Sequence, residues 1–382
     1  MISRQTFANE SSQVQQAEQV LPASETASAK PQYGQQLEGT QEYYTQQHNG
    51  APYVPRVQQS PVPSRSGFVT AIPLPFDMYG TGPIKILFLC GIGLARGSWK
   101  YQVDFFARKP EYTCLVIENR GYDDYEAHIP LQIAGSKQFA RDMQSALVEL
   151  DWTLPKSIHV VGLGLGGMIA LQLCRICPEY VASLHLVSTG QTFKRPAFSA
   201  ADSARSIQLL KRRSKVDRAE TLLDLLLPAN YLYASDPEHT NFENYRAQLL
   251  HQHKVQKLFS DEQKTLNFYL QVLAYRRHSI QKTDLWEIAA KVRFIFVSGA
   301  NDDSLIDPEC SRDLMAGLHA QGRMYEGGHM IPWQYKEEFN ADQEAMMLRA
   351  DREYTEYPPM ECLCINDLVN STDEPEPVII AK

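Results

Sequence analysis

The middle of the chain alternates short apolar and β-branched runs with longer segments in which apolar residues recur at helical spacing. The runs that predict strands are 67–74, 85–90, 114–119, 158–162, 182–188, 292–298 and 322–326. The segments that predict helices are 99–108, 136–151, 166–177 and 308–318. Because fully apolar strands are typical of buried parallel sheets, and helices separate them here, the pattern predicts an α/β fold. We expect a mostly parallel sheet covered by helices on both faces.

The two ends of the chain lack this alternation. Residues 1–66 contain 13 Gln and few aliphatic side chains, and residues 351–382 contain eight acidic and two basic residues. Neither segment can bury enough apolar surface to offset its ordering entropy, so we expect a disordered Gln-rich N-terminal region and an acidic disordered tail.

Between these ends we expect one domain whose core is divided into two parts, 67–193 and 289–350. A helix-rich insertion, 194–288, separates the two parts. The insertion follows one strand and precedes the next, so it should lie as a lid over the carboxyl ends of the strands. Ligands bind at that edge in open α/β sheets.

Charge and hydropathy exclude several classes of partner. The 37 basic and 45 acidic residues give a net charge of −8, of which the tail carries −6 by the counts above. The rest is therefore close to neutral and predicts no nucleic-acid or anionic membrane surface. The longest nearly apolar stretch, 160–171, is too short and too Gly-rich to span a bilayer.

The cysteines and the N-terminus favour an intracellular, cytoplasmic protein. The seven cysteines are an odd number and include Cys90, Cys114 and Cys174 in apparent core segments, which favours reduced thiols. The first residues show no basic segment leading into an apolar one, so no secretory signal is expected. A basic cluster at 211–215 keeps a nuclear location open. Cys174-x-x-Cys177 and Cys362-x-Cys364 could be redox or metal pairs, but no second pair at zinc spacing is present, so we expect neither metal nor cofactor.

The segment 158–168 reads as a strand, a glycine-rich turn and a helix, and two interpretations compete. Gly162, Gly164 and Gly167 fit the G-x-G-x-x-G pattern of a dinucleotide loop, but the next strand, 182–188, ends without the acidic residue that holds a ribose. The other interpretation is a nucleophile elbow of G-x-S-x-G form with Gly164 in the serine position.

With that elbow, the chain resembles the α/β-hydrolase family over about residues 67–350. Leu89-Cys90-Gly91-Ile92-Gly93 is similar to the family's His-Gly oxyanion loop, and Glu118-Asn119-Arg120-Gly121 to its Asp-x-Arg-Gly turn. Gly299-Ala300-Asn301-Asp302 matches the acid turn, and Gly327-Gly328-His329 matches the loop that presents the histidine. These motifs occur in the family's order.

The resemblance implies the roles of several residues. Asp302 and His329 would be the acid and the histidine, with the adjacent Asp303 an open alternative for the acid. The amides of Ile92 and Leu165 would form the oxyanion hole. Gly164 has no side-chain atom with which to attack, and losing the nucleophile of a well-studied serine protease lowers turnover on the order of 10⁶-fold.

Two functions follow as expectations. The first is a hydrolase-fold protein without serine-hydrolase activity, which acts by binding a small apolar ligand or a protein partner. The second is an enzyme acting on an ester-like small molecule. It would use the His–Asp dyad as a general base, or a nucleophile displaced to Ser98, Ser188 or Cys90.

Overall fold

The computed structural model describes residues 61–70, 74–120, 135–194, 215–237, 241–256, 258–259 and 265–356. Of the expected disordered regions, 1–66 and 351–382, residues 1–60 and 357–382 lie outside the described residues, as does most of the basic cluster at 211–215. The N-terminal boundary at 66 is too late, because β1 begins at Arg65.

The described strands form one eight-stranded sheet in the order β1-β2-β4-β3-β5-β6-β7-β8. β1 and β2 form an antiparallel pair, β2 is antiparallel to β4, and all other neighbours are parallel. Their bounds are β1 Arg65–Val69, β2 Leu74–Gly80, β3 Ile84–Leu89, β4 Tyr112–Ile117, β5 Ile158–Leu163, β6 Val181–Val187, β7 Phe294–Ala300 and β8 Gln321–Tyr325. The predicted α/β class with a mostly parallel sheet is confirmed.

One strand prediction was wrong. The run 67–74 is not a single strand, because β1 ends at Val69 and β2 begins at Leu74 and returns antiparallel to it. The sequence of this run contains Pro73, and proline has no N–H to donate to a strand ladder. This signal against one continuous strand was given less weight than the apolar residues of the run.

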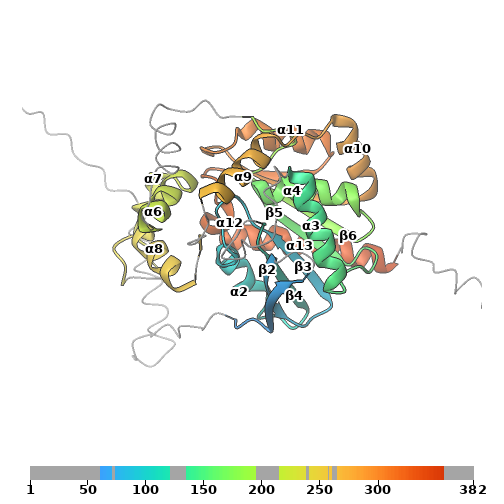
Figure 1. Ribbon diagram of the computed structural model, residues 1–382, viewed down its shortest axis with the longest axis horizontal. Helices are drawn as coiled ribbons and strands as arrows, with labels where there is room; N and C mark the ends of the chain where they lie inside the picture. The colour runs from blue at the N-terminus through green and yellow to red at the C-terminus, as the bar shows by residue number, and fades with distance from the viewer. Residues whose placement is uncertain are drawn as a thin grey trace, which may run out of the picture. The chain divides into compact units, whose positions relative to one another are not determined.

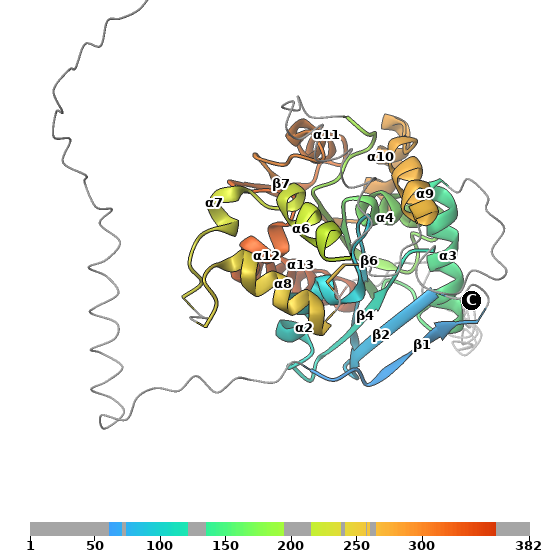
Figure 2. The ribbon, with the colours of Figure 1, turned by 60° about the vertical axis from the view of Figure 1, so that its left-hand side comes forward.

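Helices cover both faces of the sheet (Figures 1 and 2). One face packs against α3 (Ser136–Glu149), α4 (Leu165–Ile176), α9 (Thr265–Arg276), α10 (Lys282–Lys291) and α11 (Pro308–Gly317). The other packs against η1 (Arg96–Trp99), α2 (Lys100–Phe106), α12 (Ile331–Gln334) and α13 (Lys336–Glu356). None of these helices, nor any other that the structure describes, combines the length and the hydropathy that crossing a bilayer requires.

The helix-rich insertion divides between two places. α6 (Lys215–Leu226), α7 (Ala229–Leu232) and α8 (Tyr245–Gln256) lie together at one side of the domain (Figure 1). α6 adjoins the loops that follow β7 and β8: the Leu225 carbonyl accepts a hydrogen bond from Ser304 Oγ at 2.6 Å, and the Leu226 carbonyl accepts one from Met330 N at 3.2 Å. α9 and α10 instead pack into the helical layer beside α4.

Buried histidines of the sheet contact α13. The His185 ring is hydrogen-bonded to Gln343 and, at 2.8 Å, to Ser298 Oγ. His159 bonds Ser183 Oγ at 2.8 Å and Asp351 Oδ1 at 3.0 Å. Because α13 continues to Glu356, the folded core extends six residues beyond the expected boundary at 350.

Two of the buried histidines predict a loss of stability in mild acid. Burial lowers the pKa of His185 to about 4, and burial, together with the charge of Arg175, lowers that of His278 to about 3. Between pH 6.5 and these values the unfolded chain binds more protons than the folded chain, so stability falls as the pH falls. We expect the free energy of unfolding, measured with urea, to fall with decreasing pH between pH 6 and 4.5 in both proteins. The fall should be about 1 kcal/mol per pH unit smaller in His185→Gln than in wild type.

Candidate functional site

Gly164 lies at a tight turn between β5 and α4. Its backbone has φ 56° and ψ −116°, a conformation that favours glycine. Its N–H donates to the Val187 carbonyl at 2.9 Å, and its own carbonyl accepts from Thr189 Oγ1 at 2.7 Å. The turn is therefore fixed against the end of β6.

Glycines on either side of this turn allow β5, α4 and β3 to approach closely. A Cβ placed on Gly162 would lie 2.5 Å from the Gly166 carbonyl oxygen. A Cβ placed on Gly166 would lie 2.2 Å from the Leu89 carbonyl oxygen. The G-x-G-x-G spacing is thus explained by backbone packing, with no need for a bound phosphate.

His329 and Asp303 form a buried pair beside the turn. His329 Nδ1 lies 2.8 Å from Asp303 Oδ2, and both side chains are 5% exposed or less. The other carboxylate oxygen, Oδ1, accepts the N–H groups of Leu305 at 2.8 Å and Ile306 at 3.1 Å. These bonds fix the carboxylate, and the carboxylate in turn orients the imidazole.

The choice of Asp302 as the partner of the histidine needs correction. Asp302 is exposed, and its backbone N–H donates to the Gly327 carbonyl at 3.0 Å. That bond joins the acid turn to the histidine loop, but the carboxylate facing His329 is that of the next residue, Asp303. The turn that follows β7 therefore directs the side chain of Asp303, and not that of Asp302, toward the imidazole.

The far nitrogen of the imidazole faces the turn. A Cβ placed on Gly164 would lie 2.9 Å from His329 Nε2 and 3.4 Å from its Cε1. The structure therefore brings Gly164, His329 and Asp303 together, in that order from the elbow inward.

The two predicted oxyanion residues also lie at this turn. Leu165 is the fully buried first residue of α4, and half-buried Ile92 lies in the loop after β3. The loop is close to the elbow, because a Cβ on Gly91 would be 3.2 Å from the Leu163 carbonyl oxygen. Among the described residues, no backbone or side-chain group accepts a hydrogen bond from either amide.

Of the candidate displaced nucleophiles, Ser188 lies nearest to Gly164. Its carbonyl oxygen is 4.0 Å from the Cβ position at residue 164, its φ of 43° is unusual for a side-chain-bearing residue, and its buried Oγ has no hydrogen-bond partner among the described atoms. Burial strongly raises the pKa of the Cys90 thiol, whose Sγ contacts the Ala95 carbonyl, so Cys90 is a neutral packing residue. Ser98 is buried below the loop, where its carbonyl accepts from Trp333 Nε1 at 2.6 Å.

Three residues after β4 hold the surrounding segments in place, and one of them, Asn119, bonds the oxyanion loop itself, a role that sequence reasoning did not assign to it. Asn119 Nδ2 donates to the Cys90 carbonyl at 2.9 Å, and Glu118 accepts from Arg96 N at 3.0 Å. Arg120 forms a two-point ion pair with Asp142 of α3, at 2.5 and 2.6 Å. The match to the family's Asp-x-Arg-Gly turn was the available signal.

The described residues contain no cluster of His, Cys, Asp and Glu suited to a metal ion. A cavity of about 210 Å³ adjoins the histidine loop and is lined by residues of α6 and α7 with Asp302, Ser304 and Gly328. The five described cysteines are free thiols, and all of them are buried.

Substituting the two neighbouring aspartates should separate their roles. We expect Asp303→Ala to lower the free energy of unfolding by about 2–4 kcal/mol, since it removes an acceptor of three hydrogen bonds and leaves the buried imidazole unpaired. Asp302→Ala keeps its backbone bond and should change stability by less than about 0.5 kcal/mol. Urea unfolding of both variants tests this, and equal losses would contradict the assignment of Asp303.

Comparison with known proteins gives a consistent result. The family model described as "Alpha/beta hydrolase family" matches residues 86–342, more than half of the chain. No curated protein sequence matches the chain. A solved structure of the enol-lactonase from Burkholderia xenovorans LB400 is similar, with 16% identity, a TM-score of 0.57, and 74% of this chain and 100% of that chain covered.

Other structural neighbours share the fold at similar distance. A thermophilic esterase from Thermogutta terrifontis is 20% identical, with a TM-score of 0.55 and 75% of this chain and 98% of that chain covered. Est816, described as an N-acyl homoserine lactone degrading enzyme, is 20% identical, with a TM-score of 0.53 and 74% and 99% covered. Identities this low indicate a shared fold only. Together with the family match, the elbow, the acid and the histidine lead to one conclusion: the chain belongs to the alpha/beta hydrolase family.

Proposed function

We propose that this protein is a member of the family without serine-hydrolase activity, which acts by binding a small apolar ligand or a protein partner. One observation carries the proposal. The residue at the elbow is Gly164, and the space that a Cβ would fill there is limited by His329 Nε2 at 2.9 Å. An acyl-enzyme needs a nucleophilic side-chain atom at the point which the histidine faces, and glycine supplies none.

The other groups of the site support the binding of a ligand. The imidazole remains oriented by Asp303, and the amides of Ile92 and Leu165 remain available at the elbow. These groups favour a ligand with a carbonyl or carboxylate oxygen on an apolar body. The names of the structural neighbours, which describe a lactonase and an esterase, favour the same class of ligand. Buried free cysteines agree with a reducing, intracellular location.

A fluorophosphonate probe tests the absence of a nucleophile. We expect no covalent labelling of the full chain at any concentration that labels an active serine hydrolase, with adducts located by mass spectrometry. Labelling that disappears in His329→Ala would contradict the proposal, because it would require a nucleophile activated by this histidine. An adduct on Ser188 would identify the displaced nucleophile.

The intact Asp303–His329 pair favours a second candidate function. An oriented imidazole can act as a general base on a bound water without a covalent intermediate. Hydrolysis of a short-chain ester or lactone by the wild type, lost in His329→Ala but not in Ser188→Ala, would establish this enzyme. Absence of turnover in all three chains would leave the binding function.

A further inference from the structure

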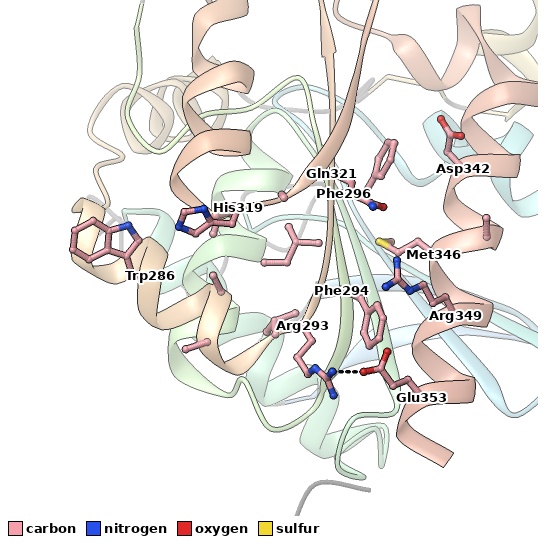
Figure 3. A pocket seen from close by; sticks show the side chains of 17 residues that line it. Trp286, Arg293, Phe294, Phe296, His319, Gln321, Asp342, Met346, Arg349 and Glu353 are labelled. Carbon is pink, nitrogen blue, oxygen red and sulfur yellow. Dashed lines mark ion pairs between the residues drawn. The ribbon is translucent and has the colours of Figure 1, made fainter. Parts of the chain in front are cut away.

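A groove of about 840 Å³ lies at the opposite end of the sheet from Gly164, where β7 begins (Figure 3). α10 forms one wall and α13 the other, and residues 318–321 lead into β8 between them. None of the residues that line it belongs to the elbow, the acid turn or the histidine loop. The groove is therefore separate from that site.

The floor of the groove lies where β7 extends beyond the start of β8, beside the edge of the sheet. The ladder between β7 and β8 begins only at Phe296 and Gln321. Phe294 and Ile295 come before this point, and they pair with Ser183 and Leu184 of β6 on their other side. β8 is the last strand of the sheet. Phe294 and Ile295 are themselves buried, but Gln321, Gly322 and Arg323 of β8 are exposed, and backbone groups at such an outer edge can pair with an added extended segment.

Two acidic and two basic side chains line the groove, and Arg349 is the one of them without an ion-pair partner among the described residues. Asp342 is 3.1 Å from Arg323, and Glu353 pairs with Arg293 (Figure 3). Arg349 is exposed; its guanidinium lies 5.6 Å from the centre of the Phe294 ring, and no acidic side chain of the described residues pairs with it. The groove therefore offers one guanidinium to an anionic group.

An exposed aromatic residue lies on the opposite wall. Trp286 of α10 is 56% exposed, although tryptophan is usually well buried, and it borders the groove across from Arg349 (Figure 3). Tryptophan and arginine are the side chains that most often dominate binding energy at protein interfaces. Both line this groove.

We propose that this groove binds an extended acidic peptide segment of a partner protein. A carboxylate of the segment pairs with Arg349, an apolar side chain packs on Trp286, and the backbone lies along the outer edge of β8. The neutralised Asp342 and Glu353 do not repel the segment. This inference goes beyond the proposed function and does not depend on it.

Binding of synthetic peptides to the full chain tests the proposal. The probe is fluorescein-labelled Leu-Asp-Val-Asp-Phe-Asp-Val, and its match has Lys in place of each Asp. Fluorescence anisotropy should show saturable binding of the acidic peptide and at least tenfold weaker binding of the basic one. Arg349→Glu should lower the affinity for the acidic peptide at least tenfold, and Trp286→Ala should lower it at least fivefold.

The matched control is Arg352→Glu, which makes the same charge change at an exposed position of α13 outside the groove. It should alter the affinity less than twofold. No binding, equal binding of both peptides, or an equal loss in Arg352→Glu would overturn the proposal. The chain's own acidic C-terminal segment would compete with the probe if it were the occupant. Tenfold tighter binding of the acidic peptide to the double variant Glu361→Gln/Asp367→Asn would therefore assign the groove to that segment instead. A dimer in sedimentation that Arg349→Glu dissociates would assign it to a second copy.

Discussion

Replacing Gly166 by Ala is expected to abolish folding. The added Cβ would lie 2.2 Å from the carbonyl oxygen of Leu89, 2.7 Å from its carbonyl carbon and 3.0 Å from the carbonyl oxygen of Cys90. All three atoms belong to backbone at the end of β3, which is held in parallel ladders on both sides. Relief of the clash would separate α4 from the sheet, so we expect a loss of at least about 4 kcal/mol, a large part of a domain's typical stability. Soluble yield, circular dichroism and urea unfolding measure the effect.

Gly135→Ala is the matched control for this substitution. Gly135 is the N-cap residue of α3, and nothing lies within 4 Å of its Cβ position. The free energy of unfolding should fall by no more than about 1 kcal/mol in this variant, since the only expected effect is that alanine is a poorer N-cap than glycine. If Gly166→Ala is as stable as Gly135→Ala, α4 does not approach β3 as closely as described.

The second large effect is expected from Gly164→Ala combined with changes at His329. Alanine at 164 meets two obstacles: a backbone with φ 56°, and an imidazole nitrogen 2.9 Å from the new Cβ. The first costs on the order of 1–3 kcal/mol, and the second adds to it because Asp303 holds the imidazole in place. We expect a total loss of about 3 kcal/mol in urea unfolding.

A double-mutant cycle separates the two obstacles. In the His329→Ala background the imidazole is gone, and Gly164→Ala should lose at least about 1 kcal/mol less than in wild type, while the backbone strain remains. If the losses of unfolding free energy in the two single variants add up to the loss in the double variant, the imidazole does not lie against the elbow. The cycle also bears on reactivation, because Gly164→Ser can gain a working nucleophile only if His329 withdraws from this space.

The sequence predicted most of the framework because its signals are local. The strand, turn and helix around Gly164 follow from glycine spacing and apolar runs, and the acid and histidine loops were predicted from short motifs after strands. The choice between Asp302 and Asp303 was not predictable, since it depends on which side chain a turn directs toward His329. Arg349 was also missed: the groove joins residues of α10 and α13 that are more than fifty positions apart in the sequence, and this side chain alone resembles an ordinary surface residue.

The long helix α13 has a consequence for how the chain acquires its fold. Ile86, Phe88 and Val187 face the side of the sheet that α13 covers. Contacts such as Lys109 with Glu344, at 2.6 Å, join residues 235 positions apart. During synthesis from the N-terminus, this apolar face is made long before the helix that covers it. We therefore expect the nascent chain to be prone to aggregation until α13 emerges, and its folding rate to be limited by this late, non-local docking.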